Sequence, residues 1–223
     1  MLIPHLITAL IIFANPVTPE VLGASNVPVI SMPATKTLAS HAMPLNDRYG
    51  NTFVNDIFKD NILLTLHYLN GDVTKKEDIN WKKIEDNFHY EFSLNPGERF
   101  VFHDKISPGY KDNVVKTTHA YFNFTDGFKS DGYLTGDGVC HIASLIHWVA
   151  KDAGLESIAP SNHDFAVIPD IPKKYGVAIY ADPGKNSIGE MQNLYIKNTF
   201  AKPVKFVFDY KDNVLTLDIV SLL

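Results

Sequence analysis

Apolar residues recur at helical spacing in two stretches of the chain. The first stretch spans residues 54–69 and carries its apolar residues on one stripe, namely Ile57, Phe58, Ile62, Leu66 and Leu69. The second begins at Cys140, and its apolar residues are Ile142, Leu145, Ile146, Val149, Ala150 and Ala153. Asn70-Gly71 and Gly154 follow these stretches, as expected for helix ends. The pattern predicts an N-terminal helix and a central helix that starts at the cysteine.

Period-two alternation predicts strands on both sides of the central helix. One follows the turn at Pro96-Gly97, and the others are predicted over residues 165–168, 176–180, 194–198 and 204–208, with a hairpin into 214–220. The charged run 72–87 is expected to form a short surface helix or an inserted loop. Because the strands do not alternate with helices, the fold class is expected to be α+β, with a mostly antiparallel sheet packed on the central helix.

The N-terminal residues have the pattern of a targeting segment. Residues 6–14 form an apolar core of signal-peptide length, and small residues precede Ala24. No Lys or Arg comes before the apolar core, so an uncleaved anchor remains an alternative to a cleaved signal peptide. Residues 25–47 are rich in Pro, Ser, Thr and Ala and are interpreted as a linker. The predicted organisation is a signal peptide or anchor over 1–24, a linker over 25–47 and one domain over 48–223.

Composition excludes two classes of partner. The net charge is −5 and no run of basic residues occurs, which argues against nucleic-acid binding. After the leader, no apolar segment is long enough to span a membrane. If the chain is exported, its single cysteine lies in an oxidising compartment, where a free thiol is either well buried or kept for reactivity or intermolecular pairing. We therefore expect an extracytoplasmic protein, secreted or associated with the cell envelope.

The candidate chemistry centres on Cys140, which follows Gly136-Asp137-Gly138 and opens the central helix. The positive end of a helix dipole favours a thiolate, and a thiolate is a nucleophile. The glycines leave room for a substrate backbone, or they make a tight turn. A structural role is the alternative, because a lone cysteine is often a small buried apolar residue.

The histidine spacing does not predict a metal site. His141 and His147 are six residues apart, about 240° around a helix, so they cannot share a face as ligands at i and i+4 do. We expect neither a metal ion nor a cofactor.

Several short motifs occur in the order seen in VanW-like domains, which the region from about Arg48 to Val220 resembles. The motifs are Asn70-Gly71, Leu94-Asn95-Pro96-Gly97-Glu98-Arg99-Phe100, Gly109-Tyr110, Gly136-Asp137-Gly138-Val139-Cys140, His163 and Asn198-Thr199 before Pro203. This is a bacterial family found in cell-envelope proteins and glycopeptide-resistance clusters. The sequence departs from the family at Asp137 and His141, where a Gly and a Gln are usual. The family's Gly-x-Asp-Ala is also missing near Gly176.

The resemblance implies a role at the cell wall, with peptidoglycan or cell-wall peptide as partner. The order of a cysteine at a helix start and a later histidine is similar to papain-like and transglutaminase-like enzymes, where histidine activates the thiol and a third group orients the ring. By that analogy Cys140 and His163 are catalytic, with Asp170 or Asp182 as the third group. Gly136, Asp137, Gly138 and His141 are expected to bind substrate.

Two functions stay open at this point. The first is an exported cysteine-dependent hydrolase or acyltransferase, an amidase, peptidase or transpeptidase of peptidoglycan peptide. The second is a non-catalytic domain that binds peptidoglycan or another envelope component, with Cys140 in a structural role.

Overall fold

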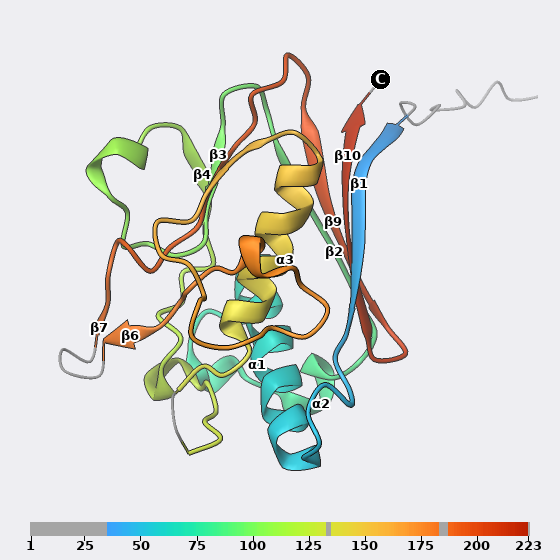
Figure 1. The fold of residues 1–223 in the computed structure, drawn as a ribbon, viewed down its shortest axis with the longest axis vertical. Helices are drawn as coiled ribbons and strands as arrows, with labels where there is room; N and C mark the ends of the chain where they lie inside the picture. The colour runs from blue at the N-terminus through green and yellow to red at the C-terminus, as the bar shows by residue number, and fades with distance from the viewer. Residues whose placement is uncertain (1–34, 133–134, 183–186, 223) are drawn as a thin grey trace, which may run out of the picture. The chain divides into compact units, whose positions relative to one another are not determined.

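Helix α3, Val139–Asp152, lies at the centre of the fold and contacts both α1 and the main sheet (Figure 1). The computed structural model describes residues 35–132, 135–182 and 187–222, which belong to one compact unit, Pro33–Leu223. The predicted leader, residues 1–24, lies outside the described residues. The other helices are α1, Thr52–Asn70, and the short α2, Trp81–Ile84. No helix among the described residues is long and apolar enough to cross a membrane.

The main sheet has four antiparallel strands in the order β1-β10-β9-β2. Their bounds are β1 Thr35–Pro44, β2 Phe88–Leu94, β9 Val204–Lys211 and β10 Val214–Leu222. Strands β9 and β10 form a hairpin through Asp212 and Asn213, which both have positive φ, as the favoured two-residue hairpin turn requires. Side chains alternate along β9, and its buried set includes Phe206 and Phe208. This alternation is why the hairpin could be predicted from the sequence.

A second sheet has the order β4-β3-β8-β5. Its strands are β3 Arg99–Val101, β4 Val114–Lys116, β5 Glu156–Ile158 and β8 Tyr195–Lys197. Strands β3 and β4 run parallel, while the other pairings are antiparallel. The short strands β6, Ala181–Asp182, and β7, Ser187–Ile188, pair with each other. The predicted α+β class with a mostly antiparallel sheet is confirmed.

Helix α1 forms where it was predicted, with a clear start and end. The Asn51 side chain accepts hydrogen bonds from the N–H groups of Phe53 and Val54, which caps the first turn. Gly71 ends the helix in the left-handed region, at φ 92°. One face of α1 packs against α3, and both helices contribute to a single hydrophobic core with the main sheet.

The structure corrects the predicted linker and two of the predicted strands. Within the predicted linker 25–47, residues 35–44 form β1, which lies at the edge of the sheet and pairs with β10. Its polar composition did not reveal this strand. Residues 165–168 and 176–180 are not strands, and Phe165 and Val167 are exposed rather than packed on a sheet. The charged run 72–87 contains η1, Lys76–Asp78, and α2, which agrees with the short surface helix expected there.

Candidate functional site

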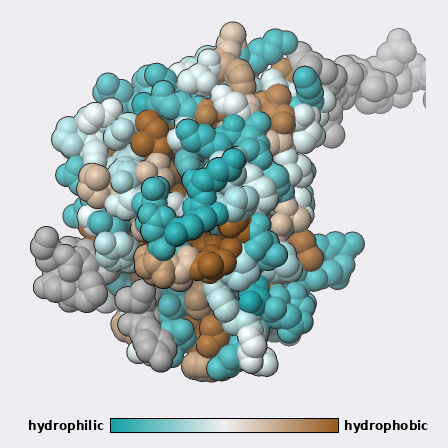
Figure 2. Space-filling model, in the orientation of Figure 1, coloured by the Kyte–Doolittle hydropathy of each residue, from teal (hydrophilic) through white to brown (hydrophobic). Residues whose placement is uncertain are grey.

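A pocket of about 120 Å³ lies at the N-terminal end of α3. It gathers most of the residues predicted for the site, namely Gly136, Asp137, Gly138, Cys140, His141 and His163. Tyr49 and Phe58, from the start of α1 and the residues before it, and Phe165, Ala166 and Val167 also line it. Figure 2 shows hydrophobic residues exposed near the middle of the face on which α3 is seen.

The two glycines before Cys140 allow close packing of backbone. Gly138 has φ 95°, and a Cβ atom there would lie 2.6 Å from the carbonyl oxygen of Phe58 in α1. Gly136 has φ 84°, and its Cβ would lie 2.8 Å from the carbonyl oxygen of Phe122. Any larger residue would therefore combine backbone strain with a collision. Gly138 sets how closely the start of α3 approaches α1, and Gly136 sets how closely the preceding turn approaches Phe122.

The Cys140 thiol both donates a hydrogen bond to the backbone of Ile179 and accepts one from it. The thiol donates to the Ile179 carbonyl oxygen at 3.2 Å, and the Ile179 N–H donates to the sulfur at 3.3 Å. Burial raises the pKa of the Cys140 thiol to about 11, and the nearby Asp137 carboxylate contributes in the same direction. We expected the helix N-terminus to favour the thiolate, but in this structure burial outweighs that effect.

Segment 161–179 is tied to α3 by hydrogen bonds, which brings His163 to the pocket. The Ser144 hydroxyl donates to the Cys140 carbonyl at 2.6 Å and accepts from the Val177 N–H at 2.8 Å. The His163 N–H in turn donates to the Gly176 carbonyl at 3.2 Å. His163 is therefore positioned through Gly176 and Ser144 by the helix that carries Cys140.

His163 is oriented by a backbone carbonyl. Its Nδ1 lies 3.1 Å from the Ala166 carbonyl oxygen. A carbonyl oxygen only accepts hydrogen bonds, so Nδ1 carries the proton and Nε2 keeps a lone pair. Burial lowers the pKa of His163, which keeps the ring neutral near pH 7. Among the hydrogen bonds of the described residues, none joins His163 to Cys140.

Asp170, expected as the third catalytic group, does not orient His163. Its carboxylate is half exposed and lies 3.3 Å from Nη1 of Arg48. The Ala166 carbonyl takes the place that the sequence analysis gave to Asp170. The sequence offered no signal for this, because any residue has a carbonyl group. The side chain of Asp182, the other candidate, lies outside the described residues.

Asp137 lines the pocket, and the pKa of its carboxyl group is raised. Burial raises the pKa of the Asp137 carboxyl to about 6, although the Asp131 N–H donates to it at 2.9 Å. The Asn61 side chain donates to the Asp137 carbonyl oxygen at 2.8 Å, which fixes the loop before α3 against α1. The carboxylate can therefore change charge between about pH 5 and pH 7 while its backbone stays fixed.

His141 contacts two residues that the sequence analysis missed. Its Nδ1 lies 3.4 Å from Nη2 of Arg48, and its Nε2 lies 3.3 Å from the Tyr49 hydroxyl. Burial and the neighbouring Arg48 hold the pKa of His141 well below its ordinary value. Arg48 and Tyr49 are more than 90 residues from His141 in the sequence, and no spacing pattern connects them.

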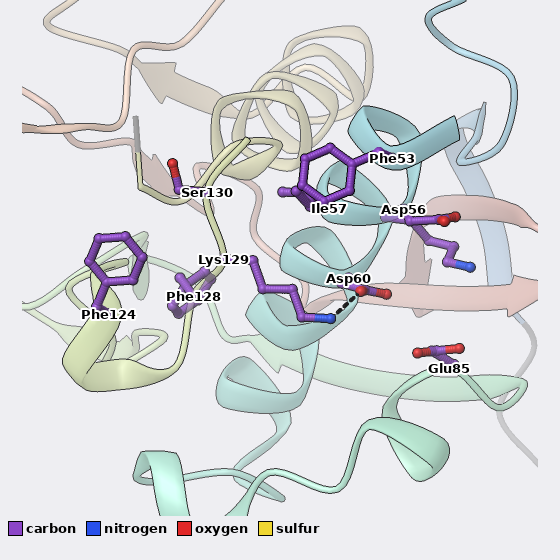
Figure 3. Close-up of a pocket in the computed structure, with 10 residues that line it drawn as sticks. Phe53, Asp56, Ile57, Asp60, Glu85, Phe124, Phe128, Lys129 and Ser130 are labelled. Carbon is purple, nitrogen blue, oxygen red and sulfur yellow. Dashed lines mark hydrogen bonds and ion pairs between the residues drawn. The ribbon is translucent and has the colours of Figure 1, made fainter. Parts of the chain in front are cut away.

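A larger pocket, of about 660 Å³, lies between α1 and the segment 124–130 (Figure 3). Lys129 forms an ion pair with Asp60 at 2.5 Å, and its ammonium also lies over the Trp81 ring. Phe53 and Phe124 are exposed at its edges. In the part of the chain that the structure describes, no group of three or more His, Cys, Asp or Glu side chains could hold a metal ion, in this pocket or elsewhere.

Comparison with known proteins identifies one family. The family described as VanW like protein matches residues 86–220, which include α3, Cys140 and His163. The match starts later than the resemblance noted from residue 48, so α1, Arg48 and Tyr49 lie outside it. No curated protein and no solved structure matches the chain.

Proposed function

The chain belongs to the VanW-like protein family, and on this premise we propose that it is an exported, cysteine-dependent hydrolase or acyltransferase that acts on peptidoglycan peptide. One observation carries the proposal. Cys140 and His163 line the same pocket, and the Ala166 carbonyl holds His163 in the tautomer that a general base needs.

The resting thiol is protonated at neutral pH, so attack requires proton transfer. As substrate binds, the Cys140 proton passes to Nε2 of His163 while the sulfur attacks the carbonyl carbon of an amide and a C–S bond forms. The C–N bond then breaks, and the leaving amine takes the proton from His163. Water or a second amine then attacks the carbonyl carbon of the thioester and gives its proton to His163. The C–S bond breaks, His163 returns the proton to the sulfur, and the acyl group leaves as an acid or a new amide.

Backbone donors near the sulfur support this chemistry. The Ile179 N–H already points at Sγ from 3.3 Å, and the start of α3 adds the partial positive charge of its helix dipole. Donors of this kind stabilise the oxyanion that forms during acyl transfer. His163 and Cys140 are not hydrogen-bonded at rest, and we expect bound substrate to close that gap, as unliganded sites are often loose.

The shape of the pocket suits an extended peptide. A volume of about 120 Å³ admits one small side chain or a carbonyl group rather than a whole ligand. Phe165 and Val167, which line the pocket, are 66% and 81% exposed and offer apolar contacts to the rest of a chain lying on the surface. The family's association with the cell envelope makes the stem peptide of peptidoglycan the substrate we propose.

A second candidate function is a non-catalytic domain that binds peptidoglycan. The observation that favours it is the pair of hydrogen bonds between Cys140 and Ile179. With a pKa near 11, the thiol can serve as a neutral tie between α3 and the segment that follows His163.

The two functions are separated by a turnover assay on soluble muropeptides, followed by mass spectrometry of the products. Wild-type protein is expected to hydrolyse a stem-peptide bond or to exchange its amine, and Cys140→Ala protein is expected to do neither. Lys129→Met, in the larger pocket, is the matched control and should retain the wild-type rate. Binding of muropeptides without turnover by the wild type would replace the catalytic proposal with the binding one. Equal turnover by Cys140→Ala would contradict both, because it would show catalysis that does not use the thiol.

Export is tested separately, by intact-mass analysis of the protein isolated from its host cells. Cleavage before a residue near Ala24, or recovery of the whole chain from the membrane fraction, agrees with a signal peptide or an anchor. Recovery of the whole chain from cytosol contradicts export.

A further inference from the structure

Arg48 is a buried cation placed beside the pocket. Its side chain is 1% exposed, and Nη1 and Nη2 donate to the carbonyl oxygens of Pro44 and Pro169 at 2.7 and 2.8 Å. The same nitrogens lie 3.3 Å from Asp170 and 3.4 Å from Nδ1 of His141. These contacts fix the guanidinium at the end of β1 and across the segment that follows His163. Arg48 is therefore a rigid, permanent donor.

The chemistry of Arg48 determines the direction of the hydrogen bonds that follow. A guanidinium only donates, so Nδ1 of His141 must accept. Neutral histidine has one donor and one acceptor nitrogen, which places the proton of His141 on Nε2. Nε2 then donates to the Tyr49 hydroxyl oxygen at 3.3 Å. The Tyr49 hydroxyl, having accepted, has its own proton left to donate.

Tyr49 is held so that this proton is available in the pocket. The Asn55 side chain accepts from the Tyr49 N–H and donates to the Tyr49 carbonyl oxygen, both at 2.8 Å. The ring packs edge-on against Phe58 at 5.0 Å between centroids, and Tyr49 lines the pocket. Within the described part of the chain, His141 is the hydrogen-bond partner of the Tyr49 hydroxyl. Burial raises the pKa of Tyr49, so the hydroxyl keeps its proton at neutral pH.

We propose that Arg48, His141 and Tyr49 form a one-way chain of hydrogen bonds that presents the Tyr49 hydroxyl proton to a carbonyl oxygen of the ligand in the pocket. Tyr49 contacts the ligand, whereas His141 and Arg48 are positioning residues. The chain defines the ligand as one that brings an amide or carboxylate oxygen beside Cys140. The inference rests on the proposed function only for the identity of the ligand as a peptide.

Binding is measured by calorimetry with a peptidoglycan stem tetrapeptide as probe, in a Cys140→Ala background so that no turnover occurs. Adding Tyr49→Phe keeps the ring but removes the donor, and we expect affinity to fall about tenfold, the effect of one hydrogen bond to a charged or desolvated oxygen. His141→Leu breaks the chain and should weaken binding by a similar factor. His141→Gln is the matched control, because an amide can accept from Arg48 and donate to Tyr49, and it should bind within about twofold of the background.

A double variant distinguishes a chain from independent packing. If Tyr49 acts through His141, adding Tyr49→Phe to His141→Leu should reduce affinity no further. Nitrogen NMR of His141 should also show the proton on Nε2 and a bare Nδ1. The inference is overturned if Tyr49→Phe binds as tightly as the background, if His141→Gln is as weak as His141→Leu, or if the background binds no peptide. If the wild-type protein binds the peptide but does not turn it over, that result would count against the catalytic proposal alone.

Discussion

Two of the pockets beside α1 differ in size and in chemistry, and the smaller of them holds the more unusual chemical groups. The larger one, about 660 Å³, has exposed carboxylates at Asp56 and Glu85 and an internal ion pair (Figure 3). The smaller one, about 120 Å³, brings together five side chains whose pKa values are shifted, chiefly by burial: Tyr49, Asp137, Cys140, His141 and His163. Groups with shifted pKa values cluster at functional sites, because catalysis needs acids and bases tuned away from their ordinary values. The comparison favours the smaller pocket as the site, despite its volume.

The largest expected effect is on turnover, when a substitution in the smaller pocket is compared with one in the larger pocket. His163→Ala removes the proposed base, and turnover of stem peptide should fall by about a hundredfold to ten-thousandfold, the usual contribution of general base catalysis. Lys129→Met, in the larger pocket, should leave turnover unchanged. Initial rates at saturating peptide provide the comparison. Equal losses in the two variants would mean that the smaller pocket has no special role.

Backbone packing beneath the smaller pocket gives the largest effect on stability. Gly138→Ala places a Cβ 2.6 Å from the Phe58 carbonyl at a positive φ, and we expect the free energy of unfolding to fall by about 3 kcal/mol or more. Gly71→Ala is the matched control, since Gly71 also has positive φ but no atom within 4 Å of its Cβ position. Its cost should be limited to the strain of about 1–2 kcal/mol. Urea denaturation measures the free energy of unfolding of both variants. Similar losses in the two would show that the collision at Gly138 contributes nothing.

The ion pair of the larger pocket should matter for stability but not for chemistry. Lys129→Met leaves the nearly buried Asp60 carboxylate without its cation, at an expected cost of about 1–2 kcal/mol in the free energy of unfolding. Lys59→Met removes a neighbouring charge that has no part in that ion pair and should change stability by less than about 0.5 kcal/mol. Thermal denaturation at neutral pH compares the two variants. If both variants lose the same stability, the ion pair between Lys129 and Asp60 makes no specific contribution.

The smallest effect concerns the acidity of the thiol. Alkylation of wild-type Cys140 should have a midpoint near pH 11, because burial holds its pKa at about 11. Asp137→Asn removes a nearby negative charge, so the midpoint should move to lower pH and labelling at pH 8 should be a few times faster. An unchanged or higher midpoint would show that Asp137 does not act on the thiol.

The same substitution has a defined effect on stability. The folded-state pKa of Asp137 is raised to about 6, so the native protein holds this proton more tightly than the unfolded chain does. By linkage, wild-type stability should fall relative to Asp137→Asn as pH rises from about 4 to about 6, and the difference should then stay constant. Because the carboxyl is half-buried, solvent screening limits the difference to about 1 kcal/mol.

Apolar periodicity in the sequence predicted the two longer helices and the C-terminal hairpin. Helices α1 and α3 and the hairpin β9–β10 form near their predicted bounds, since their apolar residues repeat at the period of the element. Strand β1 was missed because an edge strand with mostly exposed residues carries no alternation. Met43 is the buried residue of this strand, and the composition of the segment resembled that of a linker.

The candidate site was predicted where its residues share a motif or a helix, and at His163, which was chosen by its order after Cys140. Gly136 to His141 are contiguous, so the structure of α3 places them together. Ala166 contributes a carbonyl group, which the amino-acid type does not reveal, and Tyr49 reaches His141 from the segment before α1. Contacts of this kind depend on how α1, α3 and segment 161–179 pack, and local sequence patterns do not contain that information.

The central claim is that Cys140 forms a covalent bond to substrate, and intact-protein mass spectrometry tests it most directly. Wild-type protein is mixed with stem tetrapeptide, quenched in acid within seconds, and digested to find the modified residue. We predict an added mass equal to the acyl part of the peptide, carried by Cys140, and absent from Cys140→Ala protein treated in the same way. Peptide turnover with an unmodified Cys140 at every quench time, or the same adduct on the Cys140→Ala protein, would contradict the account.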